Sequence, residues 1–268
     1  SIRCVGEGMD AAALDAAGRY PGLAGRRVFV TGGATGIGAA VVRAFAGQGA
    51  QVAFVDLDAT AAAALCRSIA AAGAPAPQWT CVDVADVDAL QAAIAASSAV
   101  VGDFDVLVNN VGDDDRHTLD SVDRGYWDRC IAVNQRAAFF AIQSLVPGMR
   151  RRGGGAIVNL GSTGWKKRNA GYPVYAAAKA SVDGLTRGLA RELGADRIRI
   201  NTVTPGWVMT ERQVRLWLDE AGERELERTQ CLPLRIAPED VAAMVLFLAS
   251  DAARACTAQE FVVDAGSS

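Results

Sequence analysis

Short apolar runs alternate along the chain with longer stretches of helical periodicity. The apolar runs are strand-sized and rich in β-branched residues, and they cover residues 27–31, 51–56, 79–82, 104–109, 155–160, 198–203 and 261–263. The stretches between them predict helices over residues 37–48, 59–72, 87–100, 126–150, 174–193 and 238–249. Fully apolar strands separated by helices are typical of a parallel sheet covered on both faces and joined by right-handed crossovers. We therefore expect an α/β fold with a doubly wound sheet.

The alternation continues without an internal repeat or a shift of composition, which predicts one domain over residues 25–268 after a lead-in at 1–24. Residues 211–233, which are dense in Glu, Arg and Gln, interrupt it. A long excursion from a compact α/β unit is often a lid, and we place a lid segment at about 208–233. A solvated amphipathic helix fits the same charges equally well.

A glycine-rich loop, TGGATGIG at 31–38, follows the first strand and opens the first helix. Glycines there permit a tight turn and let the backbone and a helix N-terminus approach a pyrophosphate. Asp56 ends the second strand, where a carboxylate accepts a ribose 2′-hydroxyl and repels a 2′-phosphate, so NAD is favoured over NADP. Asp58 is better placed than Asp56 to cap the next helix. The pattern predicts a dinucleotide site.

Two further strand ends carry polar residues. Asp83 and Val84 follow the third strand, and Asn110 and Gly112 follow the fourth. Because ligands bind outside the carboxyl ends of parallel strands, we expect these residues in the same crevice.

Tyr175 and Lys179 are four residues apart in YAAAK, and Ser162 lies just beyond the strand at 155–160. Residues i and i+4 share a helix face. A neighbouring ammonium favours the phenolate and is expected to lower the tyrosine pKa from about 10, which would make Tyr175 a general base. His117 is the rival base, but it has no positioned lysine.

Composition narrows the classes of function. The chain has 268 residues, is 51% hydrophobic and 21% charged, and carries a formal net charge of -3 with a pI near 5.3, so it lacks the basic field of a nucleic-acid-binding protein. Six scattered cysteines and one histidine give no metal-ligand spacing. We also expect no membrane span and no secretory signal in residues 1–20, hence a cytoplasmic protein with reduced thiols.

The motifs together resemble those of the short-chain dehydrogenase/reductase family, over residues 26–266. They are TGGATGIG at 31–38, NNVG at 109–112, Asn134, Ser162, YAAAK at 175–179 and PGWVMT at 205–210. The departures are small: Val111 and Gly161 replace a common Ala and a frequent Ser. The resemblance implies a single-domain Rossmann fold with a seven-stranded parallel sheet and a homotetramer, while NAD as cofactor rests on Asp56.

The same resemblance implies roles for individual residues. Tyr175 would be the base, Lys179 its ammonium neighbour and ribose ligand, Ser162 the partner of the substrate hydroxyl, and Asn134 the anchor of a water in the proton relay. The cofactor-binding set would be Gly32, Thr35, Gly36, Ile37, Gly38, Asp56, Asp83, Val84, Asn110, Gly112, Tyr175, Lys179, Pro205, Gly206, Val208 and Thr210.

The expected substrate is a small molecule with many hydroxyls, because carboxylates, guanidinium groups and tryptophans surround the expected site. The candidate ligands are Asp114, Asp115, Arg116, His117, Ser162, Trp165, Tyr175, Trp207 and Arg212. GDDDRH at 112–117 and VVDAG at 262–266 resemble the subgroup of NAD-dependent aldose 1-dehydrogenases, such as those for xylose and fucose. That subgroup oxidises a pentose or 6-deoxyhexose at the anomeric carbon and releases an aldonolactone.

Two alternatives stay open. One is a 3-oxoacyl or other carbonyl reductase of the same family using NADPH, which Asp56 and the polar lid segment disfavour. The other is a nucleotide-sensing regulatory module without turnover, which predicts a broken catalytic set.

Overall fold

Seven parallel strands form a single sheet in the computed structural model, which describes residues 18–268. The strand order is β3-β2-β1-β4-β5-β6-β7, and every neighbouring pair is parallel. The strands are β1 (Arg27–Thr31), β2 (Gln51–Asp56), β3 (Gln78–Cys81), β4 (Val106–Asn109), β5 (Gly155–Leu160), β6 (Ile198–Pro205) and β7 (Glu260–Val263). The structure confirms the doubly wound α/β fold.

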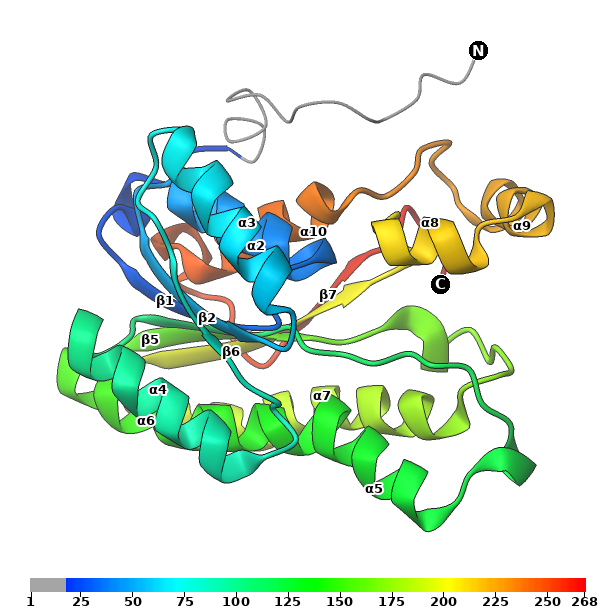
Figure 1. The fold of residues 1–268 in the computed structure, drawn as a ribbon, viewed down its shortest axis with the longest axis horizontal. Helices are drawn as coiled ribbons and strands as arrows, with labels where there is room; N and C mark the ends of the chain where they lie inside the picture. The colour runs from blue at the N-terminus through cyan, green and yellow to red at the C-terminus, as the bar shows by residue number, and fades with distance from the viewer. Residues whose placement is uncertain (1–17) are drawn as a thin grey trace.

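Helices cover both faces of the sheet (Figure 1). One layer contains α2 (Gly36–Gly47), α3 (Ala59–Ala71) and α10 (Pro238–Ala249), and the other contains α4 (Val87–Val101), α6 (Ala137–Arg152) and α7 (Pro173–Gly194). Within residues 18–268, none of the helices combines the length and the apolar character that crossing a bilayer takes.

The strand order reverses between β1 and β4. From β1 the chain builds outward through β2 and β3, then returns to place β4 on the other side of β1. The loops after β1 and β4 therefore separate at the carboxyl edge and leave a crevice, which is where open α/β sheets bind ligands.

The central strands are buried on both faces, which explains why they read as continuous apolar runs. In β1, Val28 and Val30 pack into the core on the side of α2 and α10. Phe29 points the other way and meets the ring of Phe104 edge-on at 5.3 Å. The alternation gives the sheet two separate apolar layers, so the crevice at its edge stands on a rigid base.

The long helix expected over 126–150 is wrong in detail. The chain forms α5 (Arg124–Ile131), a π-helical turn (Ala132–Arg136) and then α6. Apolar periodicity does not reveal a single turn with wider hydrogen bonding, because neighbouring side chains keep nearly the same face. Such turns are frequent at functional sites, and this one carries Asn134.

The lid segment contains two short helices, α8 (Glu211–Trp217) and α9 (Glu220–Thr229). They lie beyond the carboxyl ends of the strands, at the right of Figure 1. The segment has features of both a lid and a solvated amphipathic helix, since its helices are charged and amphipathic and also border the crevice. Its movement as a lid stays a prediction.

Candidate active site

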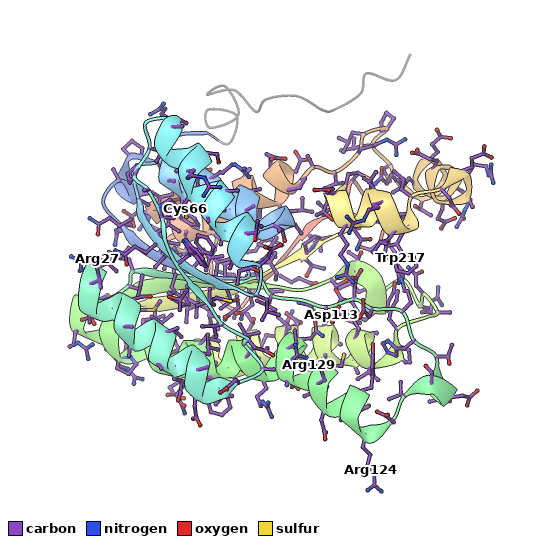
Figure 2. The ribbon with its side chains drawn as sticks, in the orientation of Figure 1. Arg27, Cys66, Asp113, Arg124, Arg129 and Trp217 are labelled. Atoms are coloured by element: carbon purple, nitrogen blue, oxygen red, sulfur yellow. The ribbon has the colours of Figure 1, made fainter. Side chains whose placement is uncertain are left out.

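A large cleft of about 1610 Å³ opens at the carboxyl edge of the sheet. Asp113 and Trp217 mark the end of the molecule where it lies (Figure 2). All sixteen residues expected to bind the dinucleotide line it, from Gly32 in the first loop to Thr210 before α8. The structure therefore gathers into one cavity residues that the sequence spreads over almost 180 positions.

The glycine-rich loop closes on itself at Gly38. A Cβ atom placed there would lie 1.8 Å from the carbonyl oxygen of Gly32, so no larger residue fits. Asn110 also secures the loop, since its Nδ2 donates to that oxygen at 2.7 Å. Thr35, the N-cap of α2, makes no side-chain capping bond, which leaves the first N–H groups of the helix for an anion.

Asp56 holds the same loop from β2. Its Oδ2 accepts the N–H of Ala34 at 2.8 Å, and its Oδ1 accepts the N–H of Asp58 at 3.0 Å. Each carboxylate oxygen can accept a second hydrogen bond, so ribose hydroxyls can still be bound. Asp58 caps α3 by accepting the N–H of Ala61 at 2.8 Å, as expected.

Asp83 is partly committed to protein contacts. Its carboxylate accepts hydrogen bonds from the Arg129 guanidinium at 2.6 Å and from the Ala85 N–H at 2.9 Å. Burial alone would raise the pKa of Asp83, but these two contacts bring it below its ordinary value. Asp83 thus stays ionised at the cleft wall.

Tyr175 lies in the first turn of α7 and faces the cleft with Ser162. Burial raises the pKa of its phenol, while the hydrogen bond with Ser162 acts in the opposite direction and Asp114 adds to the rise. The expectation that Lys179 brings this pKa below its ordinary value is therefore wrong. The cost of burying a phenolate outweighs the charges around it.

Lys179 is held by backbone carbonyl groups. Its Nζ donates to the carbonyl oxygens of Leu160 at 3.0 Å and Val111 at 3.4 Å. Burial lowers its own pKa to about 8, with Asp114 acting in the opposite direction. The ammonium is held by carbonyl groups at the floor of the cleft and carries less charge than an exposed lysine would.

Asn134 sits behind the cleft wall, not on it. Its Oδ1 accepts the N–H of Asp113 at 2.9 Å, and its Nδ2 donates to the carbonyls of Asp113 and Cys130. With Lys179 it lines a second cavity of about 10 Å³, the size of one water. Asn109 Oδ1, which has no hydrogen-bond partner among residues 18–268, borders the same cavity. The chemistry fits the expected water beside Asn134.

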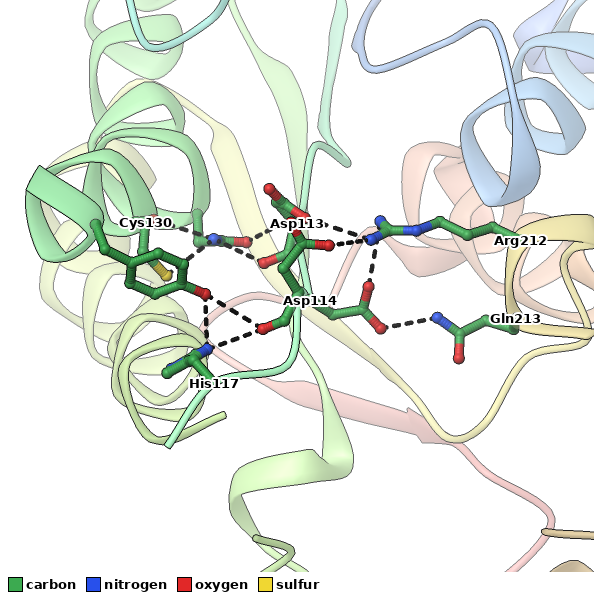
Figure 3. Close-up of polar contacts among 9 residues, drawn as sticks. Asp113, Asp114, His117, Cys130, Arg212 and Gln213 are labelled. Carbon is green, nitrogen blue, oxygen red and sulfur yellow. Dashed lines mark hydrogen bonds and ion pairs between the residues drawn. The ribbon is translucent and has the colours of Figure 1, made fainter. Parts of the chain in front are cut away.

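An acidic loop, residues 113–117, joins the cleft wall to α8 (Figure 3). Gln213 donates to the Asp114 carboxylate at 2.8 Å, and the Arg212 guanidinium contacts Asp115 at 2.6 Å and Asp114 at 3.3 Å. These contacts connect the loop after β4 with the lid segment above the cleft.

Arg116 makes a second connection between the same parts. Its guanidinium carbon lies 4.5 Å from the centre of the Tyr172 ring and 4.9 Å from that of Trp217. Tyr172 precedes α7, and its ring meets that of Tyr175 edge-on at 5.7 Å. The guanidinium is thus stacked between the helix that carries Tyr175 and the lid helix α8.

Six of the nine expected substrate residues line the cleft, namely Asp114, Arg116, Ser162, Tyr175, Trp207 and Arg212. Asp115, His117 and Trp165 do not. Asp115 turns its exposed carboxylate to Arg212, and Trp165 lies at the surface against Lys166. The His117 imidazole is buried within the protein. These three side chains therefore point away from the cleft, although their neighbours Asp114, Arg116 and Ser162 line it.

Several residues that line the cleft are outside the expected sets, among them Lys167 and Tyr172. Tyr172 is three residues before Tyr175, so the i, i+3 rule could have placed it on the same face. Lys167 donates to Ser267 Oγ at 2.6 Å, and no local pattern announces a contact across 100 residues. No group of metal-ligating side chains occurs among residues 18–268.

Comparisons with known proteins agree with this geometry. The family model described as enoyl-(acyl carrier protein) reductase matches residues 32–268. The chain is 47% identical over 247 residues to D-xylose 1-dehydrogenase of Caulobacter vibrioides, covering 92% of this chain and 97% of that protein. It is 45% identical over 248 residues to the probable galactose dehydrogenase GalD of Rhizobium meliloti, with the same two coverages.

Among solved structures, a blue fluorescent protein from a metagenomic library in complex with NADPH has a TM-score of 0.83 and 37% identity. The match covers 91% of this chain and 98% of that one.

Proposed function

The chain belongs to the short-chain dehydrogenase/reductase family, and on this premise we propose that it is an NAD-dependent aldose 1-dehydrogenase. Its substrate would be a cyclic pentose, hexose or 6-deoxyhexose, oxidised at the anomeric hydroxyl to an aldonolactone. The relatives named for xylose and galactose, which align along nearly their full lengths, support this substrate class.

The observation that carries the proposal is the polar wall that faces Tyr175. Asp114, Arg116 and Arg212 line the same cleft as the phenol, and they supply acceptors and donors for several hydroxyls. A 3-oxoacyl or steroid substrate calls for a mostly apolar pocket. Trp207, whose indole donates to Gln213 at 3.0 Å, offers an apolar face for sugar C–H groups.

The first half of the cleft fits a dinucleotide. The tight Gly32–Gly38 approach brings the loop to the N-terminus of α2, where a pyrophosphate would bind, and Asp56 lines the same cleft to accept ribose hydroxyls. Lys179 and Tyr175 line the other end of the same space. When bound, the nicotinamide supplies the acceptor for the hydride that leaves the anomeric carbon.

Residues of the chain accept the proton of the anomeric hydroxyl and pass it on. Tyr175 Oη takes the proton of the anomeric hydroxyl as general base, and Ser162 donates a hydrogen bond to the same oxygen. The charge of Lys179 adds to that of a bound, cationic nicotinamide in favouring the phenolate. The cavity shared by Lys179 and Asn134 is large enough for one water that would lead the proton away. Each group therefore acts on the proton or on the oxygen that loses it.

The test is a substrate panel with NAD at the reduced-nicotinamide absorbance band. We expect turnover with D-xylose, D-galactose or a 6-deoxyhexose, and none with simple secondary alcohols. Turnover of polyols or alcohols without any aldose would contradict the assignment, and turnover of 3-oxoacyl thioesters would favour the reductase.

We expect Asp56→Asn to shift the cofactor preference towards NADP. The single amide oxygen can accept only one of the two backbone N–H groups that the carboxylate accepts, a loss that affects both cofactors alike. The amide also no longer repels a 2′-phosphate or accepts a charge-assisted hydrogen bond from the ribose. Such a bond contributes about 1.5–3 kcal/mol, so the kcat/KM ratio of NAD to NADP should fall roughly 10- to 100-fold. Asp86→Asn, at a helix cap outside the cleft, should leave the ratio unchanged. An unchanged ratio in the Asp56 variant would remove the argument for NAD.

NADP is the second candidate cofactor, and one feature of the chain favours it. Arg43 on α2 lines the same cleft as Asp56, and a guanidinium there would offset phosphate charge. The NADPH-bound relative shows that this fold accepts the phosphorylated form. A parent enzyme that turns over NADP faster than NAD would select this alternative.

The oxidation rate should rise with pH, because the phenol must lose its proton and burial raises its pKa. Below that pKa, log kcat/KM should increase by about one per pH unit. Asp114 raises the Tyr175 pKa further, so Asp114→Asn should move the rising limb to lower pH. Asp113→Asn is the matched control whose limb should stay in place. A limb that moves to higher pH in Asp114→Asn would show that another group titrates.

A cytoplasmic homotetramer is the expected assembly. Trp127 on α5 and Phe139 on α6 are 48% and 41% exposed, and large apolar side chains on neighbouring helices favour a protein interface. The cysteines of the described residues are all free thiols, as a reducing compartment requires. Light scattering would give the mass of the assembly directly.

A further inference from the structure

The single histidine of the chain is fully engaged inside the protein. The His117 side chain is buried, and its Nε2 accepts the backbone N–H of Val174 at 3.0 Å. Its Nδ1 lies 2.8 Å from the carbonyl oxygen of Asp115 and 2.6 Å from the hydroxyl of Tyr126. Figure 3 shows the two contacts of Nδ1 beside the acidic loop. Neither ring nitrogen is left for a substrate.

The partners determine which nitrogen carries the proton. A backbone N–H only donates, so Nε2 accepts and is unprotonated. Nδ1 therefore holds the ring proton and donates towards Asp115 and Tyr126. The Tyr126 hydroxyl donates to the same Asp115 carbonyl at 3.2 Å, which closes a three-membered network around a neutral imidazole.

The network supplies a hydrogen-bond acceptor to the N-terminus of α7, which has no capping side chain of its own. Pro173, the first residue of α7, has no N–H, and the N-cap residue Tyr172 makes no side-chain capping bond. Val174 is the first N–H donor of the helix, and His117 supplies its acceptor from 57 residues away. The His117 N–H also donates to the Gly171 carbonyl at 2.8 Å. His117 thus replaces the missing cap.

Val174 directly precedes Tyr175, and His117 directly follows the charged part of the acidic loop. The same imidazole therefore fixes the turn that presents the phenol and the main chain that presents Asp114. The loop continues to the lid segment through Asp115 and Arg212.

From this geometry, and resting on the proposed role of Tyr175 as base, we infer that His117 is a positioning residue. It holds the first turn of α7 and the acidic loop in one arrangement, so that the base and the carboxylate Asp114 meet the same substrate. It contacts neither substrate nor cofactor.

Hydrogen exchange tests the inference without using catalysis. Amide exchange measured by mass spectrometry over residues 172–178 should be about tenfold faster in His117→Ala than in the parent, because an uncapped first turn opens more often. His117→Gln should restore most of the protection, since its amide oxygen can accept the Val174 N–H. Unchanged exchange in His117→Ala would overturn the inference.

Kinetics supply the second test, with D-xylose and D-galactose as probes and NAD as cofactor. His117→Ala should lower kcat by about 10- to 100-fold, the usual cost of a misplaced reacting group, while the Kd for NAD stays within about twofold. His117→Gln should recover most of kcat. Tyr126→Phe keeps the hydrogen bond from the Val174 N–H to His117 Nε2, so its kcat should fall less than that of His117→Ala.

The control is Asp86→Ala, which removes the cap of α4, where Asp86 accepts the N–H of Ala89 at 3.0 Å. None of the residues 87–101 lines the cleft, so this variant should lose thermal stability and keep kcat. If His117→Ala behaves like this control, the histidine is only structural. If His117→Gln keeps its exchange protection but is as inactive as His117→Ala, the imidazole acts chemically. Either result overturns the inference.

Failure of the proposed function gives a different pattern. A parent that oxidises no aldose would leave the exchange result intact, because that measurement needs no substrate.

Discussion

Tyr175→Phe is expected to lower kcat/KM for aldose oxidation by about 10²- to 10⁴-fold, the usual contribution of a positioned general base. The change removes one oxygen atom from a side chain whose ring packs edge-on against Tyr172, so the fold of the first turn of α7 should persist. Binding of NAD should also persist, since the glycine-rich loop and Asp56 are untouched. The measurement is initial rates with D-xylose or D-galactose together with the Kd for NAD by fluorescence titration.

The result separates the proposed enzyme from a nucleotide-sensing module. A sensing protein would bind the dinucleotide equally well in both variants and show no turnover in the parent. A Tyr175→Phe variant with parental kcat/KM would mean that another group is the base.

Gly38→Ala is expected to weaken dinucleotide binding by roughly 10- to 100-fold. The added Cβ would lie 1.8 Å from the Gly32 carbonyl oxygen and 2.7 Å from Asn110 Nδ2. The backbone atom cannot yield as a flexible side chain does, so the loop must open. Overpacking of this kind costs about 1–3 kcal/mol, and each 1.4 kcal/mol is tenfold in affinity. Calorimetric titration with NAD measures the loss.

Gly184→Ala is the matched control, because Gly184 lies within α7 with nothing within 4 Å of its added Cβ. It should raise the free energy of unfolding by about 0.5–1 kcal/mol and leave the Kd for NAD unchanged. Equal affinity in Gly38→Ala and the parent would show that the loop does not approach the pyrophosphate.

The sequence predicted the architecture well because the sheet is periodic. The bounds of β1, β2 and β5 agree with the apolar runs at 27–31, 51–56 and 155–160. A continuous apolar run indicates a strand that is buried on both faces. A glycine cluster after a strand indicates a loop that needs positive φ, as at Gly32 and Gly36. Local patterns of this kind are visible without coordinates.

What sequence reasoning could not predict depends on distant contacts. The pKa of Tyr175 was expected to fall because the sequence shows the spacing of Lys179 but not the depth of burial. His117 was expected at the substrate because the sequence shows its position in a polar loop but not the N–H of Val174 that it accepts. Both errors follow from the same cause, since desolvation and long-range hydrogen bonds are properties of the folded chain.

The hydrogen bonds that hold the acidic loop also affect how the sugar preference of this enzyme could change. Its main chain is held from behind by an imidazole, while the carboxylates and the guanidinium of residues 113–116 reach forward to Arg212, Gln213 and Trp217. We therefore expect substitutions at the forward positions to alter which sugar is accepted while the proposed base, Tyr175, keeps its place. Duplicated copies of the gene could specialise through these few codons, and directed evolution of sugar preference would do well to randomise them first while keeping His117.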